Sequence, residues 1–215
     1  MVISSVEHPA VINSSRILSE NNWDIDFWDV DQYGQINLSN IDKFISPKTK
    51  FLSLNWGQSE IGTIQKIDMI TDYCKKHDVL LHLDATQIIG KLDINFESLG
   101  VDFLSSSAHK FQGPKGIGFL MLSDKAKQLM ESTDKSRANK LIRDGTLPIS
   151  LISGMALALE IIYKKHNNND AILDSSVMNM TNTLRNSLSK IDGLRFTGHP
   201  VMRLPNHISM IIMDK

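Results

Sequence analysis

Three polar residues that can do chemistry stand at the ends of two apolar runs in this chain. Asp84 and Gln87 follow the run VLLHL, and Lys110 follows VDFLSSSAH. Apolar runs that end in polar residues are typical of parallel strands, and ligands bind at the carboxyl edge of such α/β sheets. A lysine amine at this edge can serve as a nucleophile, and a carboxylate can stabilise positive charge on a ligand.

Pyridoxal 5'-phosphate (PLP) is a cofactor that needs this combination, because it requires a lysine for a Schiff base and an acid facing its pyridinium nitrogen. We predict that Lys110 is this catalytic lysine, in a pocket whose desolvation and positive charge favour the neutral amine. Lys115 lies in the Gly-rich turn that follows, and is expected to face solvent. Asp84 is predicted to keep the ring nitrogen protonated. It could instead serve only to cap the helical turn after its strand, and the two interpretations are compatible.

Gln87 follows Asp84 by three residues, which is about one helical turn. Its amide could donate a hydrogen bond to the phenolic oxygen of the cofactor. The same spacing is a variant of the capping box, in which the glutamine side chain would return to the start of the turn. Both interpretations stay open at the level of sequence.

Six short motifs occur in a fixed order along the chain. They are EHPAV at Glu7–Val11, SEIG at Ser59–Gly62, DATQ at Asp84–Gln87, SSAHK at Ser106–Lys110, GPKGIG at Gly113–Gly118 and RDGTLP at Arg143–Pro148. With this order and spacing the chain resembles the class V aminotransferases, and within them the cysteine desulfurases. The resemblance covers most of the chain.

The resemblance implies further cofactor contacts. Ser107 and His109 match residues that contact the cofactor phosphate, and hydroxyl and imidazole donors suit a dianion. His8 matches a histidine that stacks on the pyridine ring and can carry protons, for which an imidazole is suited. Thr146 matches a threonine that reaches a phosphate across a dimer interface, which implies a homodimer with composite sites.

The implied reaction takes sulfur from L-cysteine and leaves alanine and a protein persulfide. The implied partner is a sulfur-acceptor protein, and the implied process is iron–sulfur cluster assembly. Other class V activities, such as selenocysteine lyase, a kynureninase-like lyase or an aminotransferase, share the same motifs. A non-catalytic fragment is an alternative of a different class.

The chain departs from the family pattern in three places. We expect it to be a fragment, since an upstream phosphate-binding loop and a downstream segment with the catalytic cysteine and the substrate-binding arginine have no counterpart. Ser59 stands where an asparagine is expected before EIG. The segment DKSRANKLI at residues 134–142 replaces a Gly-rich, His-containing stretch.

The composition of the chain limits which classes of partner and which cellular compartment are expected. The formal net charge is −1 without a long basic run, which argues against nucleic acid and anionic membranes as partners. No apolar run reaches the roughly 18 residues that span a bilayer, and the N-terminus lacks a basic signal-peptide region. We therefore expect a cytoplasmic protein. The single cysteine, Cys74, excludes internal disulfides, and its amphipathic surroundings predict a packing role.

Short β-rich runs alternate with amphipathic helical ones, which predicts an α/β fold with a mostly parallel sheet and crossover helices. Strands are expected at residues 1–6, 23–30, 50–56, 79–84, 101–107, 116–122, 194–198 and 207–213. Helices are expected at residues 10–22, 38–45, 64–77, 124–130, 149–165 and 175–191. Because residues 116–122 follow the preceding strand closely, that strand should be antiparallel. Residues 131–141 should be mobile. We expect a partial PLP-binding large domain at 1–165 and the beginning of a small domain at 166–215.

Overall fold

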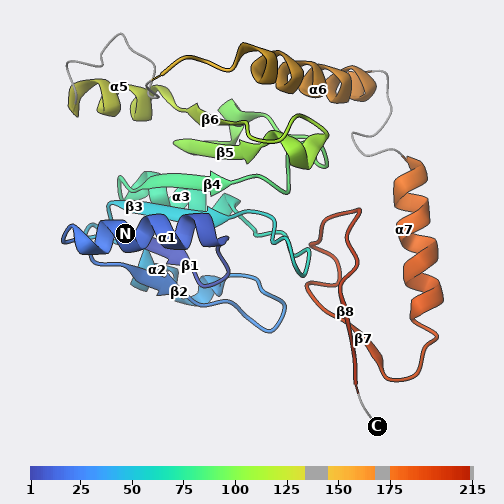
Figure 1. Cartoon of the computed structure of the whole chain (residues 1–215). Helices are drawn as coiled ribbons and strands as arrows, with labels where there is room; N and C mark the ends of the chain where they lie inside the picture. Colours follow the sequence, from blue (N-terminus) through green and yellow to red (C-terminus); the bar gives the residue numbers. More distant parts are fainter. Residues whose placement is uncertain (134–144, 168–174, 214–215) are drawn as a thin grey trace.

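A computed structural model of the chain describes residues 1–133, 145–167 and 175–213 (Figure 1). The strands are β1 (Val2–Ser4), β2 (Asp26–Trp28), β3 (Phe51–Asn55), β4 (Leu80–Asp84), β5 (Phe103–Ser107), β6 (Gly118–Leu122), β7 (Leu194–Phe196) and β8 (Met210–Ile212). The α-helices are α1 (Pro9–Glu20), α2 (Ile41–Phe44), α3 (Asp68–Lys76), α4 (Phe96–Leu99), α5 (Asp124–Thr133), α6 (Ile149–Asn167) and α7 (Ser175–Leu188). Two 3-10 helices, η1 (Leu38–Asn40) and η2 (Ala108–Phe111), complete the described elements.

The main sheet has six strands in the order β2-β1-β3-β4-β5-β6. Strands β1 to β5 are parallel, and β6 runs antiparallel to β5. Helix α1 lies on one face of this sheet and α3 on the other (Figure 1). The predicted mostly parallel α/β fold and the antiparallel sixth strand are both confirmed.

The core lies around the central strands. Leu52 and Leu54 of β3 and Leu81 and Leu83 of β4 are fully buried. Near-continuous apolar strands of this kind are typical of parallel sheets, which are covered on both faces. Cys74 lies in α3 and is buried in the same core, as its amphipathic surroundings predict.

Helix α3 begins at Asp68, four residues later than the sequence pattern predicts. The preceding residues do not form a helix because their backbone pairs elsewhere. The N–H of Gln65 donates to the carbonyl of Trp56, and the N–H of Ile64 donates to the carbonyl of Met202. Strand β2 is also shorter than predicted, while α5 extends three residues further than expected.

The C-terminal part contains α7 and a separate two-stranded sheet of antiparallel β7 and β8. The sequence pattern predicts the helix and both strands, although not the pairing of the strands. The division into domains at residues 165 and 166 stays a prediction, and α6 runs through it to Asn167. The predicted mobile segment 131–141 lies outside the described residues except for its first three, which belong to α5. None of the helices in the described ranges combines the length and apolar composition that crossing a bilayer requires.

Candidate active site

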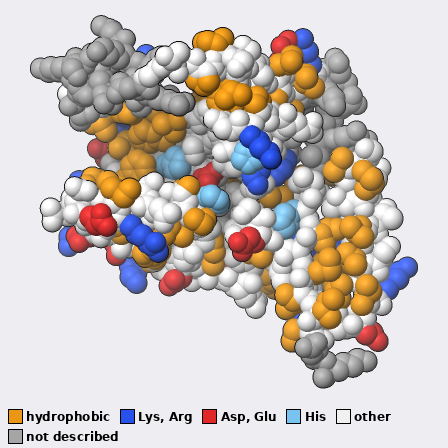
Figure 2. Space-filling view, viewed as in Figure 1, with side chains coloured by type: hydrophobic (Ala, Val, Ile, Leu, Met, Phe, Trp, Pro, Cys, Tyr) orange, Lys and Arg blue, Asp and Glu red, His pale blue; other side chains and the backbone are white. Residues whose placement is uncertain are grey.

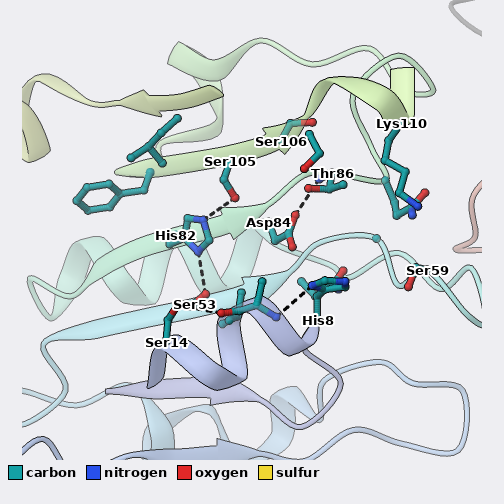
Figure 3. Close-up of a pocket in the computed structure, with 18 of the residues that line it drawn as sticks. His8, Ser14, Ser53, Ser59, His82, Asp84, Thr86, Ser105, Ser106 and Lys110 are labelled. Carbon is teal, nitrogen blue, oxygen red and sulfur yellow. Dashed lines mark hydrogen bonds between the residues drawn. The ribbon is translucent and has the colours of Figure 1, made fainter. Parts of the chain in front are cut away.

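A pocket of about 690 Å³ lies over one face of β3, β4 and β5 and reaches the carboxyl ends of these parallel strands. Asn55, Asp84 and Ser105 are register partners on β3, β4 and β5, so their side chains point to the same face of the sheet. All three line the pocket, and Figure 3 shows Asp84 and Ser105 there. In the space-filling view, histidine, lysine and acidic side chains gather near the middle of this face (Figure 2).

Six of the seven candidate residues named from the sequence line this one pocket. They are His8, Asp84, Gln87, Ser107, His109 and Lys110. They come from the start of α1, the end of β4 and the turn after it, and the end of β5 with η2. Residues separated by about one hundred positions in the chain therefore meet at one edge of the sheet.

Thr146 does not line the pocket. It is exposed and lies between Gly145, where the description of the chain resumes, and α6. Its contact with the cofactor phosphate of a second copy stays a prediction. Ser59, at the position where an asparagine is expected, does line the pocket and is exposed.

Asp84 is half-buried at the end of β4, with its carboxylate in the pocket. Its Oδ1 accepts a hydrogen bond of 2.9 Å from the N–H of Thr86. The N–H groups of Ile88 and Ile89 both donate to the carbonyl of Ala85, which forms the predicted helical turn. Asp84 therefore starts this turn and also faces the pocket, as the two compatible interpretations of its role require.

Lys110 lies on η2, directly after β5, and points into the pocket (Figure 3). The prediction that the pocket desolvates this lysine is wrong, because its side chain is exposed. Desolvation needs atoms on every side, and η2 lies at the rim of the sheet edge. Lys115 is also exposed and does not line the pocket, as expected for a residue of the Gly-rich turn.

Gln87 accepts a hydrogen bond of 2.5 Å at Oε1 from Nζ of Lys91. This is not the capping-box arrangement, in which the glutamine would return to the backbone at the start of the turn. Lys91 was not among the candidates from the sequence. Burial and, to a smaller extent, the charge of Lys110 together lower the pKa of Lys91 to about 8.

His8 is the N-cap of α1 and is exposed at the rim of the pocket. Its Nδ1 accepts a hydrogen bond of 3.2 Å from the N–H of Ala10. The neighbouring Glu7 is buried, and burial raises its pKa to about 7. Hydrogen bonds from the hydroxyl of Ser4 and the N–H of Asn55 oppose this rise.

His82 also lines the pocket, although it was not among the candidate residues from the sequence. Its Nδ1 lies 2.8 Å from Oγ of Ser53, and its Nε2 lies 2.9 Å from Oγ of Ser105 (Figure 3). Burial lowers its pKa, so the ring is neutral at pH 7. One signal for its position was present, since His82 and Asp84 are two residues apart on a strand and therefore share a face.

The donor set of this pocket fits PLP. A carboxylate at Asp84, an amide at Gln87 and a primary amine at Lys110 converge with the hydroxyl of Ser107 and the imidazole of His109. The cofactor needs an acid for its ring nitrogen, a lysine for its aldehyde and donors for its phosphate.

The chain has the fold of PLP-dependent transferases. This fold has a mostly parallel sheet, with the lysine and the acid at the carboxyl edge of its strands. The chain belongs to the class V aminotransferases, since the family model "Aminotransferase class-V" matches residues 1–214. The resemblance inferred from the six motifs is thereby confirmed.

Curated relatives and solved structures agree with this assignment. The chain is 32% identical over 211 residues to a protein named cysteine desulfurase IscS from Buchnera aphidicola subsp. Baizongia pistaciae, covering 98% of the chain and 51% of the relative. A solved NifS-like protein matches with a TM-score of 0.79 and 27% identity, over 98% of this chain and 57% of that one. A structure titled "SspA in complex with cysteine" matches with a TM-score of 0.63 and 31% identity, over 74% and 46%. The chain spans about half the length of the curated relatives it matches.

Proposed function

We propose that this chain carries the PLP-binding part of a cysteine desulfurase, an enzyme that takes sulfur from L-cysteine and leaves alanine. The observation that carries the proposal is the convergence of Asp84, Gln87 and Lys110 on one pocket at the strand ends. Relatives named cysteine desulfurases, and a related structure that holds cysteine, support L-cysteine as the substrate.

This proposal assigns a role to each candidate residue of the pocket. Bound PLP supplies an electron-withdrawing ring that stabilises negative charge developing at the α-carbon of an amino acid. Lys110 holds the cofactor and moves a proton to and from the substrate. Asp84 holds a proton on the ring nitrogen, because a carboxylate next to that nitrogen favours its charged form.

The remaining candidates bind and orient the cofactor. Ser107 and His109 donate to the phosphate, and Gln87 donates to the phenolic oxygen. His8 would lie against the ring, where its imidazole can accept and donate a proton. Thr146 is assigned to the cofactor phosphate of a second subunit, which makes the proposed enzyme a homodimer.

The sulfur-accepting thiolate is not Cys74. This cysteine is buried in the core and absent from the pocket, and it is the single cysteine of the 215 residues. The persulfide therefore forms on a cysteine outside these residues, from which a sulfur-acceptor protein takes the sulfur. A cytoplasmic location belongs to the same proposal.

The loss of the α-deuteron from labelled L-cysteine tests the proposal without requiring the sulfur-accepting cysteine. The wild-type chain with PLP should release deuterium from L-[2-²H]cysteine faster than PLP alone. Asp84→Asn is the matched variant, because it keeps an oxygen for the N–H of Thr86 and removes the negative charge. We expect it to slow the exchange by about 100-fold or more. Equal rates in wild type and Asp84→Asn, or no acceleration by the wild type, would contradict the proposal.

A further inference from the structure

Gln87 and Lys91 are four residues apart on the turn that follows β4, and their side chains touch. Nζ of Lys91 lies 2.5 Å from Oε1 of Gln87. Both side chains are half-buried, and Gln87 lines the pocket. The two residues lie on either side of Gly90, whose φ of +76° interrupts a regular helical turn, and this local bend of the backbone accompanies the contact.

The chemistry of the two groups determines which way the Gln87 amide points. A lysine ammonium has three donors and no acceptor, whereas an amide has one oxygen acceptor and one NH₂ donor. The oxygen of Gln87 must therefore face Lys91. The NH₂ group is then directed away from Lys91, as a donor for other groups.

The stem of Gln87 is held in place by the close approach of Gly57. A Cβ atom at position 57 would lie 3.4 Å from Cβ of Gln87 and 2.8 Å from Cδ1 of Ile88. Gly57 is buried and lines the same pocket. Gln87 thus has its Cβ next to Gly57 and its amide oxygen on Lys91.

Lys91 is positioned by Gly90, which has φ +76°. A Cβ atom at position 90 would come within 3.0 Å of both Phe111 Cβ and Ile162 Cδ1. The turn therefore packs tightly against η2, which carries Lys110. The charges that face Lys91 come from Lys110, and from His207 when its ring is protonated.

We propose that Lys91 is a positioning residue that holds the Gln87 amide with its NH₂ group toward the pocket, so that the site presents a hydrogen-bond donor to an anionic ligand oxygen. The inference rests on the proposed function in one respect, because that oxygen is the phenolic oxygen of PLP. The contact between Lys91 and Gln87 does not depend on it.

The first test uses the chain without cofactor. The side-chain ¹⁵N–¹H signals of Gln87, identified by their loss in Gln87→Leu, are followed from pH 6 to pH 10. In the wild type they should shift with a midpoint near the pKa of Lys91, about 8. In Lys91→Met this step should be absent, while Lys91→Arg should hold the signals at their low-pH positions. Signals that behave alike in wild type and Lys91→Met would overturn the proposal.

The second test measures the pH midpoint of the visible absorption of bound PLP in wild type, Lys91→Met, Gln87→Leu and the double variant. Lys91→Met should shift the midpoint by about half a pH unit or more in the wild-type background and hardly at all in Gln87→Leu, because residues that act through one another are not additive. Lys91→Arg should restore the wild-type midpoint. Equal shifts in both backgrounds would mean that Lys91 acts directly on the ligand, and would overturn the proposal.

The two tests separate this inference from the proposed function. If the wild-type chain takes up no PLP, the proposed function fails, and the amide signals of the cofactor-free chain still decide whether Lys91 orients Gln87. If PLP binds and the amide signals do not respond to Lys91, the positioning role alone is wrong.

Discussion

The backbone N–H of Asn55 donates a hydrogen bond of 2.5 Å to Oε1 of Glu7, which joins the segment after β1 to the end of β3. The hydroxyl of Ser4 donates to the same oxygen at 2.6 Å. Among the described residues none donates to the other carboxylate oxygen, Oε2, although it is buried. Glu7 thus fixes the loop that carries His8 to the rim of the pocket. The arrangement requires a carboxyl group to be buried with one of its oxygens unpartnered among the described residues.

Glu7 should make the stability of the fold depend on pH. Its pKa is raised from 4.5 to about 7, so the folded state binds the proton more tightly than the unfolded state. The stabilisation is present in full below pH 4.5 and is lost as the pH rises to about 7, by on the order of 3 kcal/mol in total. We expect the free energy of unfolding of the wild type to fall over this range relative to that of Glu7→Gln.

Urea unfolding of both proteins at half-unit steps from pH 4.5 to pH 8 measures this difference. Glu7→Gln keeps an oxygen for Asn55 and Ser4, and comparison with it cancels the titration of other groups such as His82. Glu20→Gln is the control, because it alters an exposed carboxylate on α1. If the difference in free energy of unfolding between wild type and Glu7→Gln stays constant from pH 4.5 to pH 8, Glu7 is ionised in the folded chain and the prediction is wrong.

The bridge from Ser53 through His82 to Ser105 should be a cooperative unit. His82→Leu leaves two hydroxyl groups without their partner, and we expect it to lower the free energy of unfolding by about 1–3 kcal/mol. The triple change of His82→Leu, Ser53→Ala and Ser105→Ala removes all three polar groups and should recover much of this loss. Denaturant unfolding of the single and triple variants checks the prediction, and strictly additive losses would refute it.

Cys74 should be inert toward thiol reagents while the chain is folded. Burial, together with the smaller effect of the Asp102 charge, raises the pKa of its thiol to about 12. Because the thiolate is the reactive form, modification by iodoacetamide at pH 8 should be at least about 100-fold slower in the folded chain than in guanidinium chloride. Rapid modification under native conditions would reopen the question of Cys74 as a sulfur acceptor.

The features that were predictable from the sequence are those set by local pattern. Asp84, Gln87 and Lys110 follow apolar runs, and the ends of parallel strands meet at one edge whatever the details of packing. The contact of Lys91 with Gln87 was less accessible, because Gly90 between them has φ +76° and interrupts the helical turn in which a spacing of four residues brings side chains together. It was missed because lysines are ordinarily solvated.

Other features depend on parts of the chain that only the fold brings together. The partners of His82 follow from the register that places Ser53 opposite His82 and Ser105 opposite Asp84. The late start of α3 follows from hydrogen bonds to residues as distant as Met202. The exposure of Lys110 depends on which segments cover the sheet edge. None of these relationships has a local signal in the sequence.

Covalent trapping of the cofactor is the most direct test of the central claim, which is that this pocket holds PLP on Lys110. The purified chain is incubated with PLP, reduced with borohydride and digested, and the pyridoxyl-lysine is located by peptide mass spectrometry. We predict one pyridoxyl group per chain on Lys110, and none in Lys110→Ala. Label spread over Lys91, Lys115 and other lysines, or undiminished label in Lys110→Ala, would contradict the account.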